Sequence, residues 1–365
     1  MSIKKIAKEA GVSTATVSRV LNNPGYKCSS EELRERIWKI ARELNYMPNE
    51  AARNLKKGIT NTSQKVWYLD VLMTRTGNLE TDPFFSELLR VIESEIHRQG
   101  CILMHIFHQP LFSNDRKCRT ENIDKVIAQM EPDGEIRSDG LIIIGKCNDN
   151  VLKKLSAKYR SIVSVNRNST NYLVDEVICD GKRIAAMAVE YLIGLGHRKI
   201  GYVGDCHNES RYKGYQDTLF QYGIDMDISF VIEAEHTEAE GYAVMERLIQ
   251  RGDAPTAIYC ANDMIAIGML KCLNKYKNRY YVPSIISSDD IEEAQYTRPM
   301  LTTVCLPKEE MGKFALYLLI DRLSGGHKGI VRTELEGKLM IRESCTLVEL
   351  SLIHISEPTR LLSIS

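Results

Sequence analysis

The sequence lacks the features of several common classes of protein. It has no apolar run of membrane-spanning length, and its first residues contain no apolar leader segment. Its ten cysteines are scattered, with no CxxC pair and no histidine in metal-ligand spacing, so we expect reduced and mostly buried thiols. P-loop, GxSxG and HExxH motifs are absent. We therefore expect a cytoplasmic protein without a metal, a cofactor or an enzymatic activity.

An excess of charge of one sign is also lacking, because 48 Lys and Arg residues balance 48 Asp and Glu residues. The distribution is uneven, however, since residues 1–58 contain 12 basic and 6 acidic side chains. A basic head on an acidic body predicts that one small domain contacts a polyanion. With 365 residues, of which 44% are hydrophobic, the chain is long enough for two or three domains.

Residues 1–46 have the pattern of three short helices. Apolar residues recur at helical spacing, Gly11 ends the first helix, and Ser13 and Ser30 are placed to cap the second and third. This arrangement predicts a helix-turn-helix domain. The alternative is a basic three-helix module that binds another kind of partner. If the second helix reads DNA, its exposed face presents hydroxyl groups for phosphates and a guanidinium group able to read guanine.

Two long segments carry a family resemblance. Residues 6–22, IAKEAGVSTATVSRVLN, and residues 45–58, NYMPNEAARNLKKG, resemble the DNA-binding head and the hinge of the LacI/GalR family, the lactose- and galactose-repressor type. The resemblance extends to about residue 346 and implies that Thr14 and Ala15 select bases and that Arg19 reads a base. It also implies that Ser2, Thr16, Ser18 and Asn49 contact the DNA on the phosphate side, and that the partner is double-stranded DNA with a pseudo-palindromic operator. The DNA-binding residues we expect are Ser2, Lys4, Thr14, Ala15, Thr16, Ser18, Arg19, Asn49, Ala52 and Leu55.

Residues 47–58 are expected to form a hinge helix, followed by a polar linker over residues 59–65. The segment from Asn49 to Lys56 is only about two helical turns long, too short to be stable alone in water. The resemblance implies that two such helices of a dimer pack together in the minor groove, where Leu55 wedges into a base step. The alternative for Leu55 is an ordinary core leucine.

Residues 66–350 alternate apolar runs with amphipathic helical patterns, which predicts parallel sheets built from βαβ units. Two such series imply two doubly wound α/β lobes with a cleft between them. The resemblance implies a periplasmic-binding-protein-like core with three crossings between the lobes. We expect lobe one to span about 66–164 and 304–325, and lobe two about 165–303 and 326–350. The third crossing is expected near residues 290–306, before a helix over 307–323.

Polar residues follow the predicted strands, where ligands of open α/β sheets bind. They include Arg75, Asn166 and Asp205, and such groups can hold a polyhydroxylated ligand beside an aromatic ring. From these groups and the resemblance, we expect six effector-binding residues: Phe84, Phe85, Arg167, Arg211, Asn262 and Asp289. Alternatives remain open: the phenylalanines as core, Arg211 as a bridge between lobes, and Asn262 as a helix cap.

Three features concern the ligand and the assembly. Residues 287–290, SSDD, lack the aromatic residue that the family usually has there, while the loop 75–82 and residues 140–146 resemble the branch that governs galactoside use. Residues 351–365 lack sustained heptads, and Pro358 interrupts any helix, so we interpret them as non-native or disordered sequence and expect a homodimer.

The sequence therefore predicts a DNA-binding transcriptional repressor of sugar-utilisation genes, controlled by a small carbohydrate such as a galactoside. The alternative function is a helix-turn-helix protein fused to a sugar kinase. That enzyme needs a phosphate-binding glycine loop after an N-terminal strand, and residues 70–77, DVLMTRTG, match such a loop poorly.

Overall fold

The structure, a computed structural model, describes residues 3–22, 30–43, 66–75, 82–114, 117–130, 137–166, 168, 170–207, 209–276 and 281–348. The chain divides into two compact units, Met1–Val66 and Trp67–Ser365, which are described separately. The expected hinge at 47–58, the linker at 59–65 and the tail at 351–365 lie outside the described residues and stay predictions.

The first unit contains three helices around one small core, in the order that the capping residues predict. They are α1 (Ile3–Ala10), α2 (Thr14–Asn22) and α3 (Glu31–Glu43). Gly11 has a φ of 67°, which suits the tight turn before α2. The hydroxyl groups of Ser13 and Ser30 accept backbone N–H groups of α2 and α3, at 3.1 and 3.2 Å. Ile6, Val17 and Ile37 are fully buried between the helices. This is the predicted helix-turn-helix domain.

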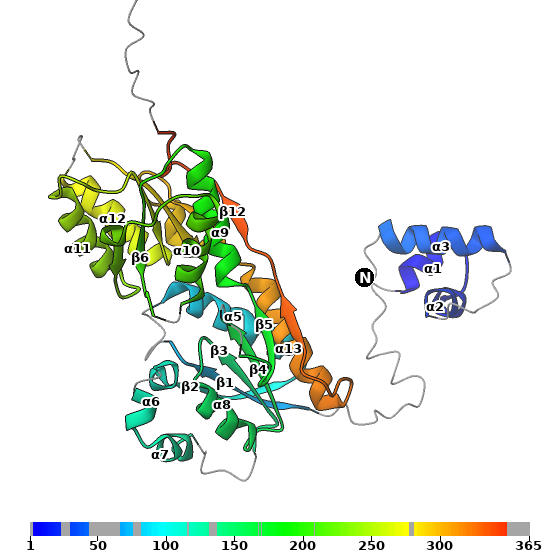
Figure 1. The fold of residues 1–365 in the computed structure, drawn as a ribbon. Coiled ribbons are helices and arrows are strands. Elements are labelled where there is room, and N and C mark those ends of the chain that lie inside the picture. The colour runs from blue at the N-terminus through cyan, green and yellow to red at the C-terminus, as the bar shows by residue number, and fades with distance from the viewer. Residues whose placement is uncertain are drawn as a thin grey trace, which may run out of the picture. The chain divides into compact units, whose positions relative to one another are not determined.

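The second unit consists of two α/β lobes (Figure 1). Lobe one is built on a six-stranded parallel sheet with the strand order β11-β5-β4-β3-β1-β2. Its strands are β1 (Tyr68–Met73), β2 (Ile102–His108), β3 (Gly140–Ile144), β4 (Ser161–Asn166), β5 (Asp175–Ile178) and β11 (Arg332–Glu334). The central strand β3 is buried on both faces and is a continuous apolar run, whereas the equally central β4 also contains two buried serines, Ser161 and Ser164.

Helices cover both faces of this sheet. They are α5 (Pro83–Arg98), α6 (Lys117–Thr120), α7 (Ile123–Ala128), α8 (Asp149–Ser156) and α13 (Lys308–Ser324), with a 3-10 turn η1 (Pro110–Ser113). Asp82 caps α5 by accepting the N–H of Phe84 at 3.1 Å, and Pro83 occupies the first turn. Helices α5 and α13 pack against each other over one face, and α7 and α8 line the core on the other.

Lobe two repeats the arrangement with the strand order β12-β10-β9-β8-β6-β7. Its strands are β6 (Ile200–Gly204), β7 (Val231–Glu233), β8 (Ala257–Cys260), β9 (Ser284–Asp289), β10 (Thr302–Cys305) and β12 (Lys338–Met340). All pairs are parallel except β10 with β12. Its helices are α9 (Gly181–Gly194), α10 (Ser210–Gln221), α11 (Glu238–Ile249) and α12 (Asp263–Tyr276), with 3-10 turns η2 (Ile228–Phe230) and η3 (Glu292–Gln295).

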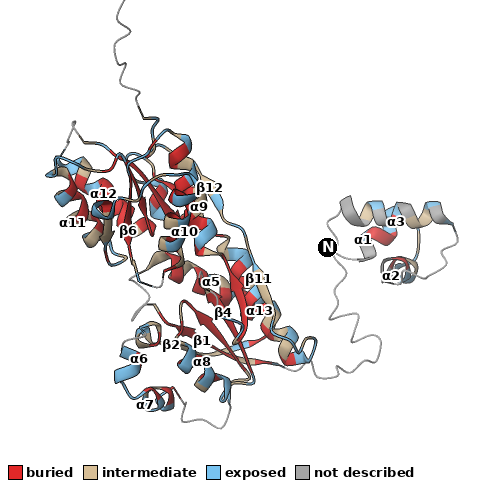
Figure 2. Ribbon diagram, in the orientation of Figure 1, coloured by how far each residue is buried: buried red, intermediate tan, exposed pale blue. Residues whose placement is uncertain are grey.

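Burial is concentrated in the strands and in the inner faces of the helices that cover them (Figure 2). Two glycines allow α11 and α12 to approach closely, because a Cβ on Gly241 would lie 2.0 Å from the carbonyl oxygen of Ile265. A Cβ on Gly268 would lie equally close to the backbone of α11. The doubly wound fold class predicted from the sequence is therefore correct.

The lobe boundaries differ from those expected. Strand β5 pairs with β4, and β11 pairs with β5, so residues 165–178 and the segment through residue 334 belong to lobe one. The expectation assigned both stretches to lobe two; neither β5, which begins with two acidic residues, nor β11, RTE, has an apolar strand pattern. The crossings lie at 179–180, 306–307 and 335–337. The return into α13 is thus the second crossing and not the third.

Two further findings concern membrane-spanning helices and the state of the cysteines. Within the described ranges, no helix is both long and apolar enough to cross a lipid bilayer. Nine cysteines lie in these ranges as free thiols, and only Cys206, Cys305 and Cys345 are partly exposed.

Candidate functional site

The predicted recognition helix α2 presents a short polar face. Thr14, Ala15 and Arg19 are exposed, while Val17 and Val20 on the opposite side are buried in the core. Thr16 is partly exposed, and its hydroxyl lies 2.9 Å from that of Ser13. Helix α2 is thus held by its apolar side and leaves the predicted base-reading residues accessible.

The structure describes the other predicted DNA-binding residues only in part. Lys4 lies in α1 and Ser18 in α2, but their side chains are not described. Ser2, Asn49, Ala52 and Leu55 lie outside the described residues. Their roles stay predictions.

In the second unit, a small cavity lies where the two lobes meet. It is lined by Arg75, Phe85, Lys146, Asn166 and Asn168 from lobe one and by Asp205 and Glu209 from lobe two. Most of these residues follow the carboxyl end of a parallel strand, the edge at which ligands of open α/β sheets bind. The volume is about 20 Å³, room for about one water molecule, so a larger ligand requires the lobes to move apart here.

Two polar contacts join the lobes at this cavity. The Arg75 guanidinium contacts Nδ1 of His236, and the backbone N–H of Ser210 donates to the Asn168 side chain at 3.3 Å. Gly145 makes room for Arg75: its φ is 102°, and a Cβ there would lie 2.9 Å from the Arg75 stem. The cavity is therefore closed by side chains from both lobes.

A buried ion pair supports the lobe-two wall. Glu209 accepts hydrogen bonds from Nε and Nη2 of Arg211 at 3.0 and 3.2 Å, and Arg211 Nη1 donates to the Ala261 carbonyl. Arg211 has no exposed surface and Glu209 is 5% exposed. Burial by itself would raise the pKa of Glu209, but the charge and the hydrogen bonds of Arg211 outweigh it and lower that pKa. The pair is ionised and is held within lobe two.

Asp205, on the same wall, titrates differently. Burial raises the pKa of the Asp205 carboxyl, and the neighbouring charges of Glu209 and Glu233 act in the same direction. Its Oδ1 accepts the backbone N–H of His207 at 2.6 Å. Asp205 is therefore the cavity carboxylate that gains a proton more readily as the pH falls.

The structure brings together only part of the predicted effector-binding set. Phe85 lines the cavity, and Phe84 is buried beside it with the two rings in an edge-to-face contact, their centroids 5.2 Å apart. Arg167 lies outside the described residues. Arg211 is buried behind Glu209, and its hydrogen bonds to described residues all lie within lobe two.

Asn262 and Asp289 lie at the carboxyl ends of β8 and β9, both 2% exposed. Asn262 Oδ1 accepts the N–H of Ile265 at 3.1 Å, which is the cap that the alternative interpretation describes, and its amide group donates to the His236 carbonyl at 3.4 Å. The charge of Asp289 helps to raise the pKa of Arg211, after the larger effect of Glu209. Neither residue lines the cavity.

Arg75, Asn166 and Asp205 follow predicted strands, but they are not among the six effector-binding residues that we expected from the sequence. Lys146, Asn168 and Glu209 were not predicted as binding residues. Lys146 directly follows β3 and its Gly145 turn, a position that the strand-end rule could have included. Glu209 directly precedes α10 and caps it, since its side chain accepts the N–H of Arg211. A capping position is only a weak indication of a binding residue.

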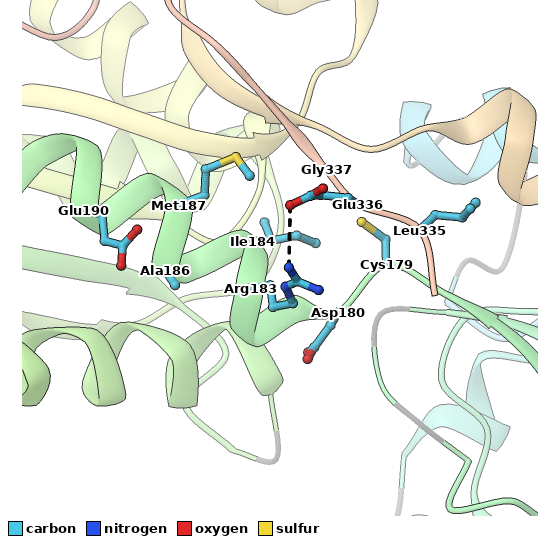
Figure 3. A pocket seen from close by; sticks show the side chains of 10 residues that line it. All are labelled: Cys179, Asp180, Arg183, Ile184, Ala186, Met187, Glu190, Leu335, Glu336 and Gly337. Atoms are coloured by element: carbon cyan, nitrogen blue, oxygen red, sulfur yellow. Dashed lines mark ion pairs between the residues drawn. The ribbon is translucent and has the colours of Figure 1, made fainter. Parts of the chain in front are cut away.

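A second, separate pocket lies beside the crossings. It measures about 220 Å³ and is lined by residues of α9 and by the first and third crossings. Figure 3 shows Arg183 pointing from α9 toward Glu336, and the ion pair between them spans 3.5 Å. Arg183 also lies 3.4 Å from Glu334. These ion pairs join lobe two to the strand that leaves lobe one.

The segment proposed for the kinase alternative, residues 70–77, begins inside β1, and residues 76–77 lie outside the described residues. Asp70, at its start, is buried within β1, where it accepts the Tyr159 hydroxyl at 2.8 Å and contacts His105 at 3.1 Å. Within the described part of the chain, no group of three or more His, Cys, Asp or Glu side chains could hold a metal ion.

Together, a helix-turn-helix unit and a two-lobed unit with a polar cavity between its lobes define a class of protein: ligand-controlled DNA-binding regulators. Residues 2–49 match the bacterial regulatory proteins of the lacI family, and residues 189–345 match the periplasmic binding protein-like domain.

Relatives match over nearly the full length. The HTH-type transcriptional repressor MelR of Bacillus subtilis is 31% identical over 357 residues, which cover 94% of this chain and 97% of MelR. The ribose operon repressor of Haemophilus influenzae is 30% identical over 353 residues, covering 94% and 98%. The repressor PurR of Haemophilus influenzae is 29% identical over 360 residues, with the same coverage. The chain belongs to the LacI family and is a DNA-binding transcriptional repressor.

Solved structures share the fold. The complex of the regulator CelR with cellobiose has a TM-score of 0.64 at 23% identity, covering 94% of this chain and 100% of CelR. A lac repressor dimer bound to operator and the anti-inducer ONPF has a TM-score of 0.63 at 23% identity, covering 95% and 99%.

Proposed function

We propose that this protein is a homodimeric repressor of sugar-utilisation genes, and that a small carbohydrate bound between the lobes controls its affinity for a pseudo-palindromic operator. The carrying observation is the convergence of amide, carboxylate and guanidinium groups from both lobes on one cavity, next to Phe85. Such groups suit sugar hydroxyls, each of which donates and accepts, while an aromatic ring suits the CH face of the sugar.

The relatives support a carbohydrate as the ligand class. One relative is a repressor of a ribose operon, and the core of this chain shares its fold with a regulator in complex with cellobiose. The galactoside suggested by the sequence is one candidate within this class. The effector-binding residues of this proposal are those that line the cavity, with Arg211 positioning Glu209 behind them.

For operator binding, we propose that Arg19 reads a base, that Thr14 and Ala15 limit which bases fit, and that hydroxyl and basic side chains near them contact phosphates. Effector binding changes the relation of the lobes, and the hinge helices then lose their mutual support. Thermodynamic linkage requires that operator DNA change effector affinity by the same factor.

The test is selection of binding sites from a pool of randomised palindromic duplexes by the purified full-length protein, followed by fluorescence anisotropy with mono- and disaccharides. We expect enrichment of a two-fold symmetric site and its release by one sugar. Failure to enrich any site would contradict the repressor function. Sugar-dependent transfer of phosphate from ATP would instead support the kinase alternative.

A further inference from the structure

A much larger pocket, here called the chamber, lies next to the cavity between the lobes. Lys146, Asn166 and Asn168 line both spaces. The chamber has a volume of about 1130 Å³, enough for a ligand much larger than a monosaccharide, whereas the cavity holds about 20 Å³. A ligand of the proposed class therefore has its main space in the chamber as the lobes now stand.

Charge distinguishes the chamber from the cavity. Six basic side chains line the chamber: Arg119, Lys146, Lys153, Lys182, Lys213 and Arg332. Among the residues that the structure describes, two acidic side chains, Asp149 and Asp180, also line it. In the cavity, by contrast, two basic side chains meet two acidic ones. The described lining of the chamber is thus more positively charged than that of the cavity.

Part of this positive charge is compensated locally. Lys182 is ion-paired with Asp217 at 2.7 Å, and Arg332 contacts Glu334 at 3.3 Å. The other basic side chains of the chamber are Arg119, Lys146, Lys153 and Lys213, all exposed or partly exposed. These four come from both lobes, because Lys213 lies on α10 and the others belong to lobe one.

Neutral hydrogen-bonding groups line the rest of the chamber. Asparagine dominates, with Asn148, Asn150, Asn166, Asn168 and Asn171, accompanied by Thr170 and Ser210. Each amide both donates and accepts, as sugar hydroxyls do. A positively charged space rich in amides suits a molecule that combines hydroxyl groups with an anionic group, since guanidinium and ammonium groups form strong hydrogen bonds with phosphate and carboxylate oxygens.

We propose that the effector is an anionic sugar derivative, a sugar phosphate or a sugar acid, whose charged group lies in the chamber between Arg119 and Lys153 of lobe one and Lys213 of lobe two. This inference rests on the proposed function and specifies its ligand class. An anion between cations of opposite lobes attracts both sides, so it favours the closed arrangement of the lobes.

Isothermal titration calorimetry of the full-length protein with matched ligands tests this proposal. The ligands are ribose and ribose 5-phosphate, then galactose, galactose 6-phosphate and galactonate, and glucose, glucose 6-phosphate and gluconate, with inorganic phosphate alone as a further probe. We expect an anionic member to bind about tenfold or more tightly than its neutral counterpart, and its affinity to fall as salt is raised. Comparison of the sugar phosphates with the sugar acids shows which anionic group the chamber binds.

Variants localise the effect. Lys153→Gln and Lys213→Gln should each weaken the anionic ligand about two- to fivefold and leave neutral sugars unchanged. The matched control is Lys125→Gln, an exposed lysine of α7 that does not line the chamber, and it should change nothing. Tighter binding of a neutral sugar, or equal effects of all three variants, overturns this inference while the carbohydrate-controlled repressor stands. Binding of none of the ligands also overturns this inference, and the operator-selection experiment then decides whether the repressor function stands.

Discussion

Replacement of Arg211 by alanine tests whether this residue supports the fold of lobe two or contacts the effector directly. The substitution leaves the Glu209 carboxylate buried, 5% exposed, without its ionic partner. Breaking a buried pair by removing one member costs about 3–5 kcal/mol, because the remaining charge stays desolvated. We therefore expect the free energy of unfolding of the core to fall by that amount at pH 7.

The pH dependence should follow the pKa of Glu209. In the native protein this pKa is lowered by Arg211 despite burial, so the contribution of Glu209 is present above its unfolded pKa and is lost as the pH falls through its folded pKa. Without Arg211, the raising effect of burial is opposed only by the smaller effects of His236 and Arg75, so we expect the pKa of Glu209 to rise. Glu209 then takes up a proton on acidification, and the difference between variant and native protein should shrink from pH 7 to pH 5.

Urea unfolding followed by circular dichroism measures both effects. A double variant, Glu209→Gln with Arg211→Met, removes both charges and should recover most of the lost stability. Lys182→Ala, which breaks the exposed pair with Asp217, is the control and should cost at most about 1 kcal/mol. A loss below about 1 kcal/mol for Arg211→Ala, or a double variant as unstable as the single one, would refute the structural role of this pair.

Three further predictions concern other parts of the molecule. Arg19→Ala should weaken operator binding by about 1–3 kcal/mol and relax the preference at one base pair; an unchanged selected motif would contradict base reading. Gly241→Ala should destabilise the core by about 2 kcal/mol or more, because the new Cβ would meet the Ile265 carbonyl. Gly252→Ala, in open space, is the control and should be tolerated. Equal melting temperatures of the two variants would exclude the clash at Gly241. Burial lowers the pKa of His197, so the stability of the core should fall as the pH drops through about 6.5. His197→Gln should flatten this dependence in melting curves recorded from pH 8 to 5, and an unaltered pH profile in the variant would contradict the role of His197.

The sequence predicts the elements whose local signals agree with their burial. Apolar residues at helical spacing predict a helix over Pro83–Arg98, and α5 has these bounds because Asp82 caps it and Gly100 follows it with a φ of 69°. Apolar runs predict strands over Gly140–Ile144 and Ala257–Cys260, and β3 and β8 have these bounds because every residue in them is buried. Strand β5 was missed because it begins with Asp175 and Glu176, residues that are rare in strands.

Distant partners explain why β5 forms. Arg322 and His327, about 150 positions further along the chain, bind the Asp175 carboxylate, which lowers its pKa despite burial. Glu176 accepts the hydroxyl of Thr170 at 2.8 Å. No local pattern contains these interactions. The site was predicted in part for a similar reason: strand-end polar residues are visible in the sequence, but whether Asn262 faces a ligand or caps a helix depends on the packed structure.

The three crossings restrict how the lobes can move. Two bodies joined at three points along one side cannot slide apart, so the remaining low-energy motion is a rotation about the line of the crossings. The third crossing is held closely, because Arg183 pairs with Glu334 and Glu336 and a Cβ on Gly337 would lie 3.0 Å from the Val304 side chain. The angular range of the core is thus set partly at residues 335–337. Substitutions there can alter the size of the response to a ligand while every ligand contact stays the same.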